Sequence, residues 1–588
     1  MISLSRSACE RYIEFISSFK HNRNKHFLTR YQEIIVNYFK SSAFRDKQLL
    51  LLFMEVGTGK TLTSLACGIE GLKSGEFKKI VILSPKAVQD EFERNLEMYY
   101  KFSGQPGYKQ TREKIVMIPY NANNSQEQFR KLGNLEDTLF IIDEAHLFMK
   151  SVIKTQIAAP KKPSKSSAKK TRKTVKKPHS KDDKRDSSQT AERNEEKPGK
   201  NVGNSKNIYD MINGLKHKKV ICLTGTPSSK HPFETVPIFN LAGCNLPNTF
   251  DEFNREYVDD IRGEIKNRRK LIDKIKGMVA FVASDAKSQN LKVSSLEEIN
   301  VEMSVPQYKQ YLIDYKKELD EKGFTNKKNV YGLLFGAKSS FHAKTFEDSI
   351  YWNDSLTNRE NDKNRYPGTI QPDMQHCPKV IRMFNDSLKF NGPCVFYFRF
   401  VRMYGTDTME AVLRKNGYRL VKPNEDVFQR KEKRYVLFTG NVPNATRVKW
   451  KKLFNDRRNM YGEYIKYLIL SPSGSVGVTL RNVRFLGIGS VEFNYSSMRQ
   501  ILGRVNRLNS HINLPEKDRK LTNRLYISEK NMKYYSEHKK EIDKLCSRTT
   551  YKWNQPAPTI ERIIYQDSIH DDIINESFRL CLMEASIL

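Results

Sequence analysis

A short loop with two glycines carries the most specific chemical signature in the sequence. The segment MEVGTGKT spans 54–61 and follows an apolar run that begins at Leu49. Gly57 and Gly59 allow the backbone N–H groups to wrap around a phosphate, and a helix that follows directs its positive end at the same anion. Met54 stands where the strict pattern has a glycine, so the shorter form G-x-G-K-T is present.

The polar residues of this loop predict which phosphate-bearing ligand it binds. Lys60 can reach the β- and γ-phosphates of ATP, and Thr61 can place its hydroxyl on Mg²⁺. Thr58 lies between the two glycines. A turn with these residues by chance is the alternative, and the order of strand, loop and helix argues against it.

A second group of polar residues follows another apolar run. The segment FIIDEAH spans 140–146, so that Asp143 and Glu144 follow directly after three apolar residues. Ligands of open parallel sheets bind at the carboxyl ends of the strands. We therefore expect Asp143 to hold Mg²⁺, Glu144 to orient and deprotonate the attacking water, and His146 to couple the site to a second domain. Capping of a helix is the alternative role for two adjacent acids.

The segments that must position these residues alternate between strand-like and helix-like patterns. Apolar spacing predicts a helix over 61–72, a helix through Val88, Phe92 and Leu96, and a strand over 297–305. The region 233–282 is predicted to be mostly helical. Short apolar runs predict strands at 49–56, 80–83, 116–118, 139–142 and 220–223, and again at 395–400, 435–438, 467–470, 485–488 and 524–527. This alternation predicts an α/β fold with two parallel-sheet domains in tandem.

At this point the motifs resemble those of superfamily 2 helicases and translocases, which have two RecA-like domains. The string DEAH at 143–146 is diagnostic of that family. The resemblance implies that Gln32 contacts adenine and that Thr224 and Thr226 couple hydrolysis to domain movement. It also implies that Ser84, Pro85 and Lys86 contact a nucleic-acid strand.

The second half continues the resemblance in order. The segment SGSVGVTL at 473–480 resembles the glycine-rich nucleic-acid loop, which implies contacts from Ser473, Gly474 and Thr479. The segment QILGRVNR at 500–507 resembles Q-x-x-G-R-x-x-R. This likeness assigns catalytic roles to Gln500, Arg504 and Arg507, since a guanidinium stabilises charge that develops on the γ-phosphate. Arg504 and Arg507 are three residues apart, so we expect both to face the cleft from one helix turn.

Within the superfamily, the strings FIIDEAHLF, ICLTGTP and VEFNYSSMRQILGRVNRLNSH resemble the poxvirus-type nucleoside triphosphatases and the small subunit of the early transcription factor. That group is shared by large cytoplasmic DNA viruses and resembles helicases of cytoplasmic linear plasmids. FDEFNREYV at 250–258 is also similar to Swi/Snf-type translocases. The resemblance implies a nucleic-acid-dependent ATPase of viral-type transcription, with RNA polymerase or other transcription factors as partners.

Two other functions stay open on the sequence alone. The first is a general helicase or duplex remodeller of replication and repair. The second is an inactive helicase-like scaffold, against which the intact Lys60, Asp143, Glu144 and both arginines argue. DNA is the expected track, and RNA is the alternative.

The charge of the chain agrees with a phosphate-rich partner. The 588 residues include 102 Lys and Arg but only 67 Asp and Glu, a net charge of +35. Ten of the positive charges fall within 151–180, where no acid occurs. The range 154–206 has few large apolar residues and predicts a disordered insertion. Its basic run at 160–178 suggests a nucleic-acid tether or a nuclear-import signal.

The remaining composition restricts the class of protein. No apolar run reaches the ~18–20 residues of a membrane span, and no secretory signal is visible, so we expect an intracellular protein, in the host cytoplasm or the virion if viral. The eight cysteines include no pair spaced for zinc, and we expect reduced thiols. The predicted order is a helical segment at 1–24, a first RecA-like domain at 25–231, a helical segment at 232–296, a second domain at 297–530 with an insertion at 326–377, and a helical tail at 531–588.

Overall fold

The computed structural model describes nine stretches of the chain: 27–55, 58–158, 202–283, 292–322, 343–351, 370–475, 478–506, 510–547 and 558–588. They form two compact units. The first comprises the described residues of Met1–Leu50 and Thr61–Leu223, and the second those of Leu51–Lys60 and Thr224–Leu588. The predicted N-terminal helical segment at 1–24 lies outside the described residues.

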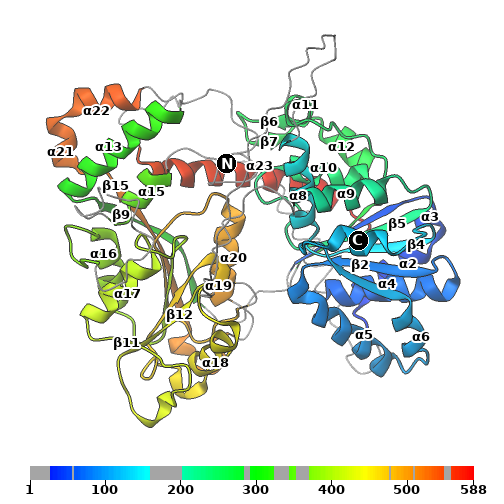
Figure 1. The fold of residues 1–588 in the computed structure, drawn as a ribbon, viewed down its shortest axis with the longest axis horizontal. Coiled ribbons are helices and arrows are strands. Elements are labelled where there is room, and N and C mark those ends of the chain that lie inside the picture. Colours follow the sequence, from blue (N-terminus) through cyan, green and yellow to red (C-terminus); the bar gives the residue numbers. More distant parts are fainter. Residues whose placement is uncertain are drawn as a thin grey trace, which may run out of the picture. The chain divides into compact units, whose positions relative to one another are not determined.

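The first sheet has six strands in the order β3-β2-β4-β5-β1-β8, of which Figure 1 labels β2, β4 and β5. Its pairings of β2 with β3 and β4, of β4 with β5, and of β1 with β8 are parallel. All six residues of β1 are buried, as expected for a strand covered on both faces. The strands are β1 (Leu49–Met54), β2 (Lys79–Ser84), β3 (Ile115–Pro119), β4 (Thr138–Ile142), β5 (Lys218–Thr224) and β8 (Val279–Val282).

The helices of the first half connect these strands, as the alternating pattern predicted. They are α2 (Arg30–Lys40), α3 (Ser42–Arg45), α4 (Lys60–Ser74), α5 (Gln89–Ser103), α6 (Tyr108–Glu113), α7 (Ser125–Arg130), α8 (Ala145–Ala158) and α9 (Val202–Asn213), with the 3₁₀ turn η1 (Lys86–Val88).

The predicted disordered insertion at 154–206 is wrong at both of its ends. Helix α8 continues to Ala158, and α9 already begins at Val202. The two helices pack against each other, with Ile153 buried in α8 and Ile208 in α9. These apolar positions anchor the helices beyond the range that composition alone suggested. Residues 159–201 lie outside the described part of the chain.

The segment at 233–282 is only partly helical, which corrects the prediction of a mostly helical region. Between its helices it forms a short antiparallel hairpin of β6 with β7, and it ends in β8, which pairs with β1. Strand β8 has four buried residues, too few to stand out from the helical pattern before it. The elements are η2 (Pro232–Thr235), α10 (Val236–Asn240), α11 (Phe250–Tyr257), β6 (Val258–Asp259), β7 (Glu264–Ile265) and α12 (Arg268–Ile275).

The second sheet has seven strands in the order β11-β12-β13-β10-β14-β15-β9, and all its pairings are parallel. The chain therefore has an α/β fold with two parallel sheets in tandem, as predicted. The strands are β9 (Lys292–Glu302), β10 (Cys394–Tyr397), β11 (Arg419–Leu420), β12 (Arg434–Phe438), β13 (Tyr467–Leu470), β14 (Phe485–Ile488) and β15 (Lys520–Glu529).

The helices of the second half surround this sheet, and the described parts of the tail, 531–547 and 558–588, contain three more helices. They are α13 (Val305–Lys322), α15 (Ala343–Asp348), α16 (Pro378–Ser387), α17 (Thr406–Lys415), α18 (Asn444–Phe454), α19 (Pro472–Ser475), α20 (Tyr495–Val505), α21 (Met532–Glu537), α22 (Lys539–Cys546) and α23 (Ile560–Glu584), with the 3₁₀ turns η6 (Val427–Gln429), η7 (Arg457–Asn459) and η8 (Glu516–Asp518). Among the described helices, none is both long and apolar enough to cross a membrane.

Candidate functional site

The phosphate loop lies between the carboxyl end of β1 and the start of α4, as the sequence predicted. Gly59 has a φ of +83°, a conformation that glycine adopts without strain. The Glu55 carbonyl accepts hydrogen bonds from the N–H and the hydroxyl of Thr58, at 3.3 and 2.6 Å. The Lys60 ammonium donates to the carbonyl of Met54, at 3.1 Å. The described part of the loop is consistent with a phosphate-binding turn, and Val56 and Gly57 lie outside the described residues.

Gln32, the predicted adenine contact, has a structural role in the first unit. Its side chain is buried, and its amide donates to the hydroxyl of Thr63 at 3.1 Å. Its carbonyl accepts from the N–H of Thr29, at 2.9 Å, as part of a capping box. Gln32 thus connects the start of α2 to the first turn of α4, the helix that also contains Thr61.

The two predicted catalytic acids follow β4. Asp143 is 7% exposed, and its carboxylate accepts the N–H of Glu144 at 2.9 Å. Glu144 has a φ of +46°, which is uncommon for a residue with a side chain and is found at functional sites. Its side chain is 39% exposed and approaches Nδ1 of His146 at 3.4 Å. Asp143, Glu144 and His146 therefore form one cluster, with Glu144 as its accessible carboxylate.

Two buried hydroxyl groups lie at the carboxyl ends of β2, the neighbour of β4, and of β3, the next strand outward. Ser84 ends β2 and Tyr120 follows β3, and the Tyr120 N–H donates to the Ser84 carbonyl at 3.3 Å. Neither hydroxyl has a hydrogen-bond partner among the described residues. Burial and the nearby charges of Asp143 and Glu144 raise the pKa of the Tyr120 phenol. These hydroxyl groups lie at the edge of the sheet where ligands of parallel sheets bind.

The other first-half motifs differ in their exposure. Ser84 is fully buried, so any nucleic-acid contact of its motif falls to the half-exposed Pro85 and the exposed Lys86. Thr224 ends β5 and is also buried, and its hydroxyl accepts the N–H of Thr226 at 3.0 Å. Thr224 therefore shapes the turn that its motif forms.

In the second half, the glycine-rich loop lies beside the arginine helix α20. Ser473 is exposed, whereas Gly474 is buried so closely against Phe438 that a Cβ atom would lie 1.7 Å from the carbonyl oxygen of that residue. The N–H of Leu480, directly after Thr479, donates to the carbonyl of Arg504 at 3.0 Å. The structure thus brings Thr479 and Arg504 together.

Helix α20 presents only part of the arginine motif. Gln500 is exposed and Arg504 is half-buried on this helix. The helix ends at Val505, with Asn506 as its cap, and Arg507 lies outside the described residues. The expectation that both arginines face the cleft from one helix turn therefore stays a prediction, since Arg507 is not among the described residues.

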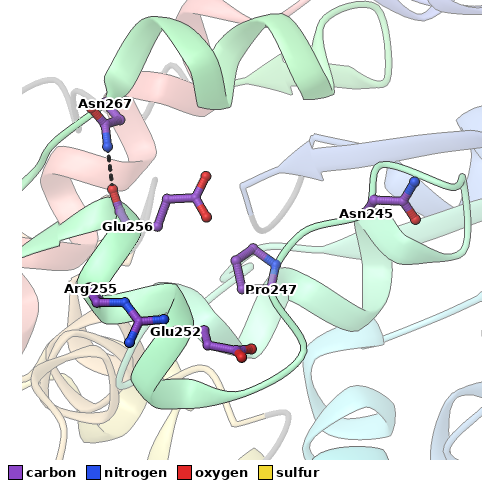
Figure 2. A pocket seen from close by; sticks show the side chains of 6 residues that line it. All are labelled: Asn245, Pro247, Glu252, Arg255, Glu256 and Asn267. Carbon is purple, nitrogen blue, oxygen red and sulfur yellow. Dashed lines mark hydrogen bonds between the residues drawn. The ribbon is translucent and has the colours of Figure 1, made fainter.

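A hollow in the second unit lies outside the phosphate-loop, DEAH and arginine motifs. Figure 2 shows it lined by Asn245, Pro247, Glu252, Arg255, Glu256 and Asn267. Asn267 donates a hydrogen bond to the carbonyl of Glu256 at 2.6 Å. Glu252, Arg255 and Glu256 belong to the segment FDEFNREYV that resembles Swi/Snf-type translocases, and the hollow is open and polar, unlike a preformed small-molecule pocket.

Sequence reasoning missed three groups of this site. Tyr120 could have been found, because it is a polar residue directly after an apolar strand, as Asp143 is. Glu55 precedes the phosphate loop and pairs with Arg579 of α23 at 2.7 Å. That pair joins residues 524 positions apart, and no local pattern signals it.

Comparisons with known proteins agree with these motifs. The family described as type III restriction enzyme, res subunit, matches residues 25–229, and the SNF2-related domain matches residues 196–357. "Termination factor NPH-I homolog" of African swine fever virus is 25% identical, covering 95% of this chain and 80% of that protein. "Putative helicase 087L" of Invertebrate iridescent virus 3 is 26% identical, over 87% of this chain and 50% of that protein.

Among solved structures, the SWI2/SNF2 ATPase core of Sulfolobus solfataricus in complex with dsDNA aligns at 13% identity and a TM-score of 0.31, over 96% of this chain and 98% of that one. The two family matches overlap at 196–229, a range that includes β5 of the first sheet. The viral relatives align along almost the whole chain. The chain is therefore similar to helicase-type ATPases, with a match to the type III restriction enzyme family over 25–229 and to the SNF2-related domain over 196–357.

Proposed function

We propose that this protein hydrolyses ATP in response to nucleic acid and uses the energy to move along DNA during viral-type transcription. The observation that carries the proposal is the pair of features at the carboxyl ends of β1 and β4. One is a glycine-containing turn that leads to Lys60, and the other is an accessible Glu144 beside a buried Asp143. The name of the African swine fever virus relative, a termination factor, supports the role in transcription.

The roles of the residues follow from their chemistry. Lys60 binds the β- and γ-phosphates as a point charge. Glu144 accepts the proton of the attacking water, and His146 orients the Glu144 carboxylate from 3.4 Å. Arg504 and Arg507 supply positive charge to the transition state. Lys86 and Ser473, both exposed, contact the phosphates of the nucleic-acid strand.

The residues present fit a magnesium ion bound together with a nucleotide. In the part of the chain that the structure describes, no three His, Cys, Asp or Glu side chains cluster as a metal site. Mg²⁺ typically takes one or two protein ligands and completes its shell with phosphates and water, so Asp143 and Thr61 are a sufficient set. When bound, the ion neutralises charge on the phosphates.

An ATPase assay with three activators tests the proposal. Single-stranded DNA, duplex DNA and RNA are compared at equal nucleotide concentration, and DNA is expected to stimulate turnover most. Strand displacement by the purified protein would favour the general helicase function, and stimulation without displacement favours translocation. Turnover that no nucleic acid changes would contradict the proposal.

A lysine pair on one helix supplies the matched variants. Lys60→Ala should lose nucleotide affinity and turnover, because Lys60 begins α4 at the phosphate loop. Lys73→Ala lies at the far end of α4, where Lys73 pairs with Glu70 on the surface, and it should leave both unchanged. Normal kinetics of Lys60→Ala would refute the assignment of the loop.

A further inference from the structure

The C-terminal helix α23 contacts a strand of each sheet and the helix that contains the arginine motif. The 25-residue helix packs against β15 of the second sheet, against β8 of the first, and against the arginine helix α20 (Figure 1). No sequence motif falls within it.

Both ends of α23 are firmly held. At its start, Glu561 and Lys379 form an ion pair at 2.6 Å with both side chains fully buried, and Glu561 also accepts the N–H of Ser528. Just beyond its end, the hydroxyl of Ser586 accepts the N–H of Phe281 in β8, at 3.0 Å. The helix is therefore held in a defined position along its length.

A continuous chain of charges runs between these ends. Arg499 of α20 donates to Asp572 at 2.7 Å and to Glu576 at 2.5 Å. Glu576 also contacts Arg579 at 3.5 Å, and Arg579 donates to Glu55 at 2.7 Å. The helix residues are four and three positions apart, so they share one face of α23. We call Asp572, Arg499, Glu576, Arg579 and Glu55 the charge chain.

At the end of the charge chain nearest the phosphate loop, two aromatic rings flank the guanidinium of Arg579. Its guanidinium lies 5.3 Å from the ring of Phe281 and 5.8 Å from that of Phe53, and these two rings pack at 4.8 Å. Cation–π contacts of this kind restrict the head group. Its partner Glu55 is the residue whose carbonyl accepts both hydrogen bonds from Thr58 in the phosphate loop. A shift of Arg579 therefore acts directly on the residue from which the loop turns.

At the other end, Arg499 precedes Gln500 in the helix that contains Arg504. Arg499 is bound by two carboxylates, so a movement of α20 pulls on Asp572 and Glu576 together. Glu576 is shared by both arginines and transmits that pull to Arg579. Charge networks of this kind act together more strongly than isolated surface pairs.

We propose that the charge chain couples the position of helix α20 to the shape of the phosphate loop, with Arg579 as the positioning residue for Glu55. The proposal rests on the proposed function in that it assigns ATP to this loop. The coupling itself is a property of the protein without ligand, and it can be measured in that state.

Hydrogen–deuterium exchange of the full chain without nucleotide tests the coupling. Arg579→Gln should speed amide exchange in the peptide 55–66, because the ion pair between Glu55 and Arg579 is lost. Arg499→Gln, at the far end of the charge chain, should speed exchange in the same peptide. If Arg499→Gln changes only peptides of α20 and α23, the coupling is refuted.

A second ion pair of the same helix provides the matched control. Arg268 of α12 pairs with Glu584 of α23 at 2.5 Å and is not part of the charge chain. Arg268→Gln should leave exchange at 55–66 unchanged. Equal acceleration by Arg268→Gln and Arg579→Gln would show general loosening of α23 and would overturn the proposal. Arg579→Lys, which keeps the charge without the fork, should give an intermediate acceleration.

Steady-state kinetics distinguish positioning from folding. Arg579→Gln should raise the KM for ATP about fivefold, the change that an ion pair of ~1 kcal/mol produces, with a smaller change in kcat. An unchanged KM in an active enzyme would contradict the positioning role. A wild-type protein without ATPase activity would refute the proposed function, whereas the exchange experiment would still decide the coupling.

Discussion

The polar groups at the carboxyl ends of the two parallel sheets differ in whether they have hydrogen-bond partners within the protein. At the carboxyl ends of β2 and β3 in the first sheet, the hydroxyls of Ser84 and Tyr120 have no partner among the described residues, and Glu144 after β4 has a positive φ. After β10 and β14 in the second sheet, Tyr397 donates to Glu492 at 2.5 Å, and Ser490 accepts the N–H of Arg399 at 2.6 Å.

Arg399 completes the polar network at the carboxyl end of the second sheet. Its guanidinium pairs with Glu492 and lies 4.5 Å from the ring of Phe493. The polar groups at the carboxyl end of the second sheet therefore satisfy one another, whereas the hydroxyls of Ser84 and Tyr120 in the first sheet have no partner among the described residues. A parallel sheet alone does not make a nucleotide site. We therefore expect unsatisfied polar groups to mark the carboxyl end at which a ligand binds.

Glu144→Gln should have the largest effect, and on activity alone. The amide cannot accept a proton from water, so kcat should fall by about a hundredfold to ten-thousandfold while ATP binding is retained. The unfolding transition should stay unchanged, because Glu144 is partly exposed. Glu127→Gln, at a surface ion pair with Lys131, is the matched control and should keep full activity. Full turnover of Glu144→Gln would remove the contrast between the carboxyl ends of the two sheets.

Acid should destabilise the second half through Glu425. Hydrogen bonds and ion pairs from Arg419, with further charge from Arg434, hold the pKa of Glu425 at about 2. Because this pKa is depressed in the folded state, the stabilisation is present above the unfolded pKa of ~4.5 and is lost as the pH falls toward 2. The loss should reach roughly 2–3 kcal/mol, measured by urea unfolding between pH 5 and pH 2.5.

The matched variants for this pH dependence are two Glu→Gln changes. Glu425→Gln should flatten it, since the titrating group is gone. Glu463→Gln removes an exposed pair with Lys431 and should leave the pH dependence as it is. Equal slopes in all three proteins would show that Glu425 does not titrate as the geometry indicates.

Glu492→Gln should lower stability and leave ATP turnover nearly unchanged, which is the opposite of the result expected for Glu144→Gln. Glu492 is 4% exposed and serves both Tyr397 and Arg399, so loss of its charge should cost about 2 kcal/mol of unfolding free energy. ATP turnover per folded molecule should change little, because the polar groups at the carboxyl end of the second sheet satisfy one another. A large loss of turnover without loss of stability would show that this end of the sheet also takes part in the reaction.

Much of the fold was predictable because buried parallel strands are continuous apolar runs. The run LLLLFM gives β1, and FII with the acids after it gives both β4 and the predicted catalytic pair. The strand β8 was missed because four residues after a helical pattern do not stand out. The ends of α8 and α9 were missed because the polar composition of 154–206 extends into both helices. The few isoleucines there do not form a clear helical pattern.

The charge chain could not be predicted, for a physical reason. Periodicity and spacing report neighbours within a few residues, whereas Arg579 and Glu55 meet only through the tertiary fold. The same holds for the buried pair of Lys379 and Glu561, where burial lowers the pKa of the lysine and raises that of the glutamate. The roles of Gln32 and Arg504 in the reaction stay predictions.

The smallest expected effects are on the free energy of unfolding, when one tyrosine at the carboxyl end of each sheet is changed to phenylalanine. Tyr120→Phe removes a buried hydroxyl that has no partner among the described residues, so the free energy of unfolding should rise by about 1 kcal/mol. Tyr397→Phe removes a hydroxyl that donates to Glu492, so it should fall by about 1 kcal/mol. Thermal unfolding of both variants measures the signs, and each variant is the control for the other. Because the lost atom is the same, opposite signs can come only from the surroundings of the two rings. If both variants lose stability, the Tyr120 hydroxyl is satisfied in solution, and the contrast between the carboxyl ends of the two sheets does not hold.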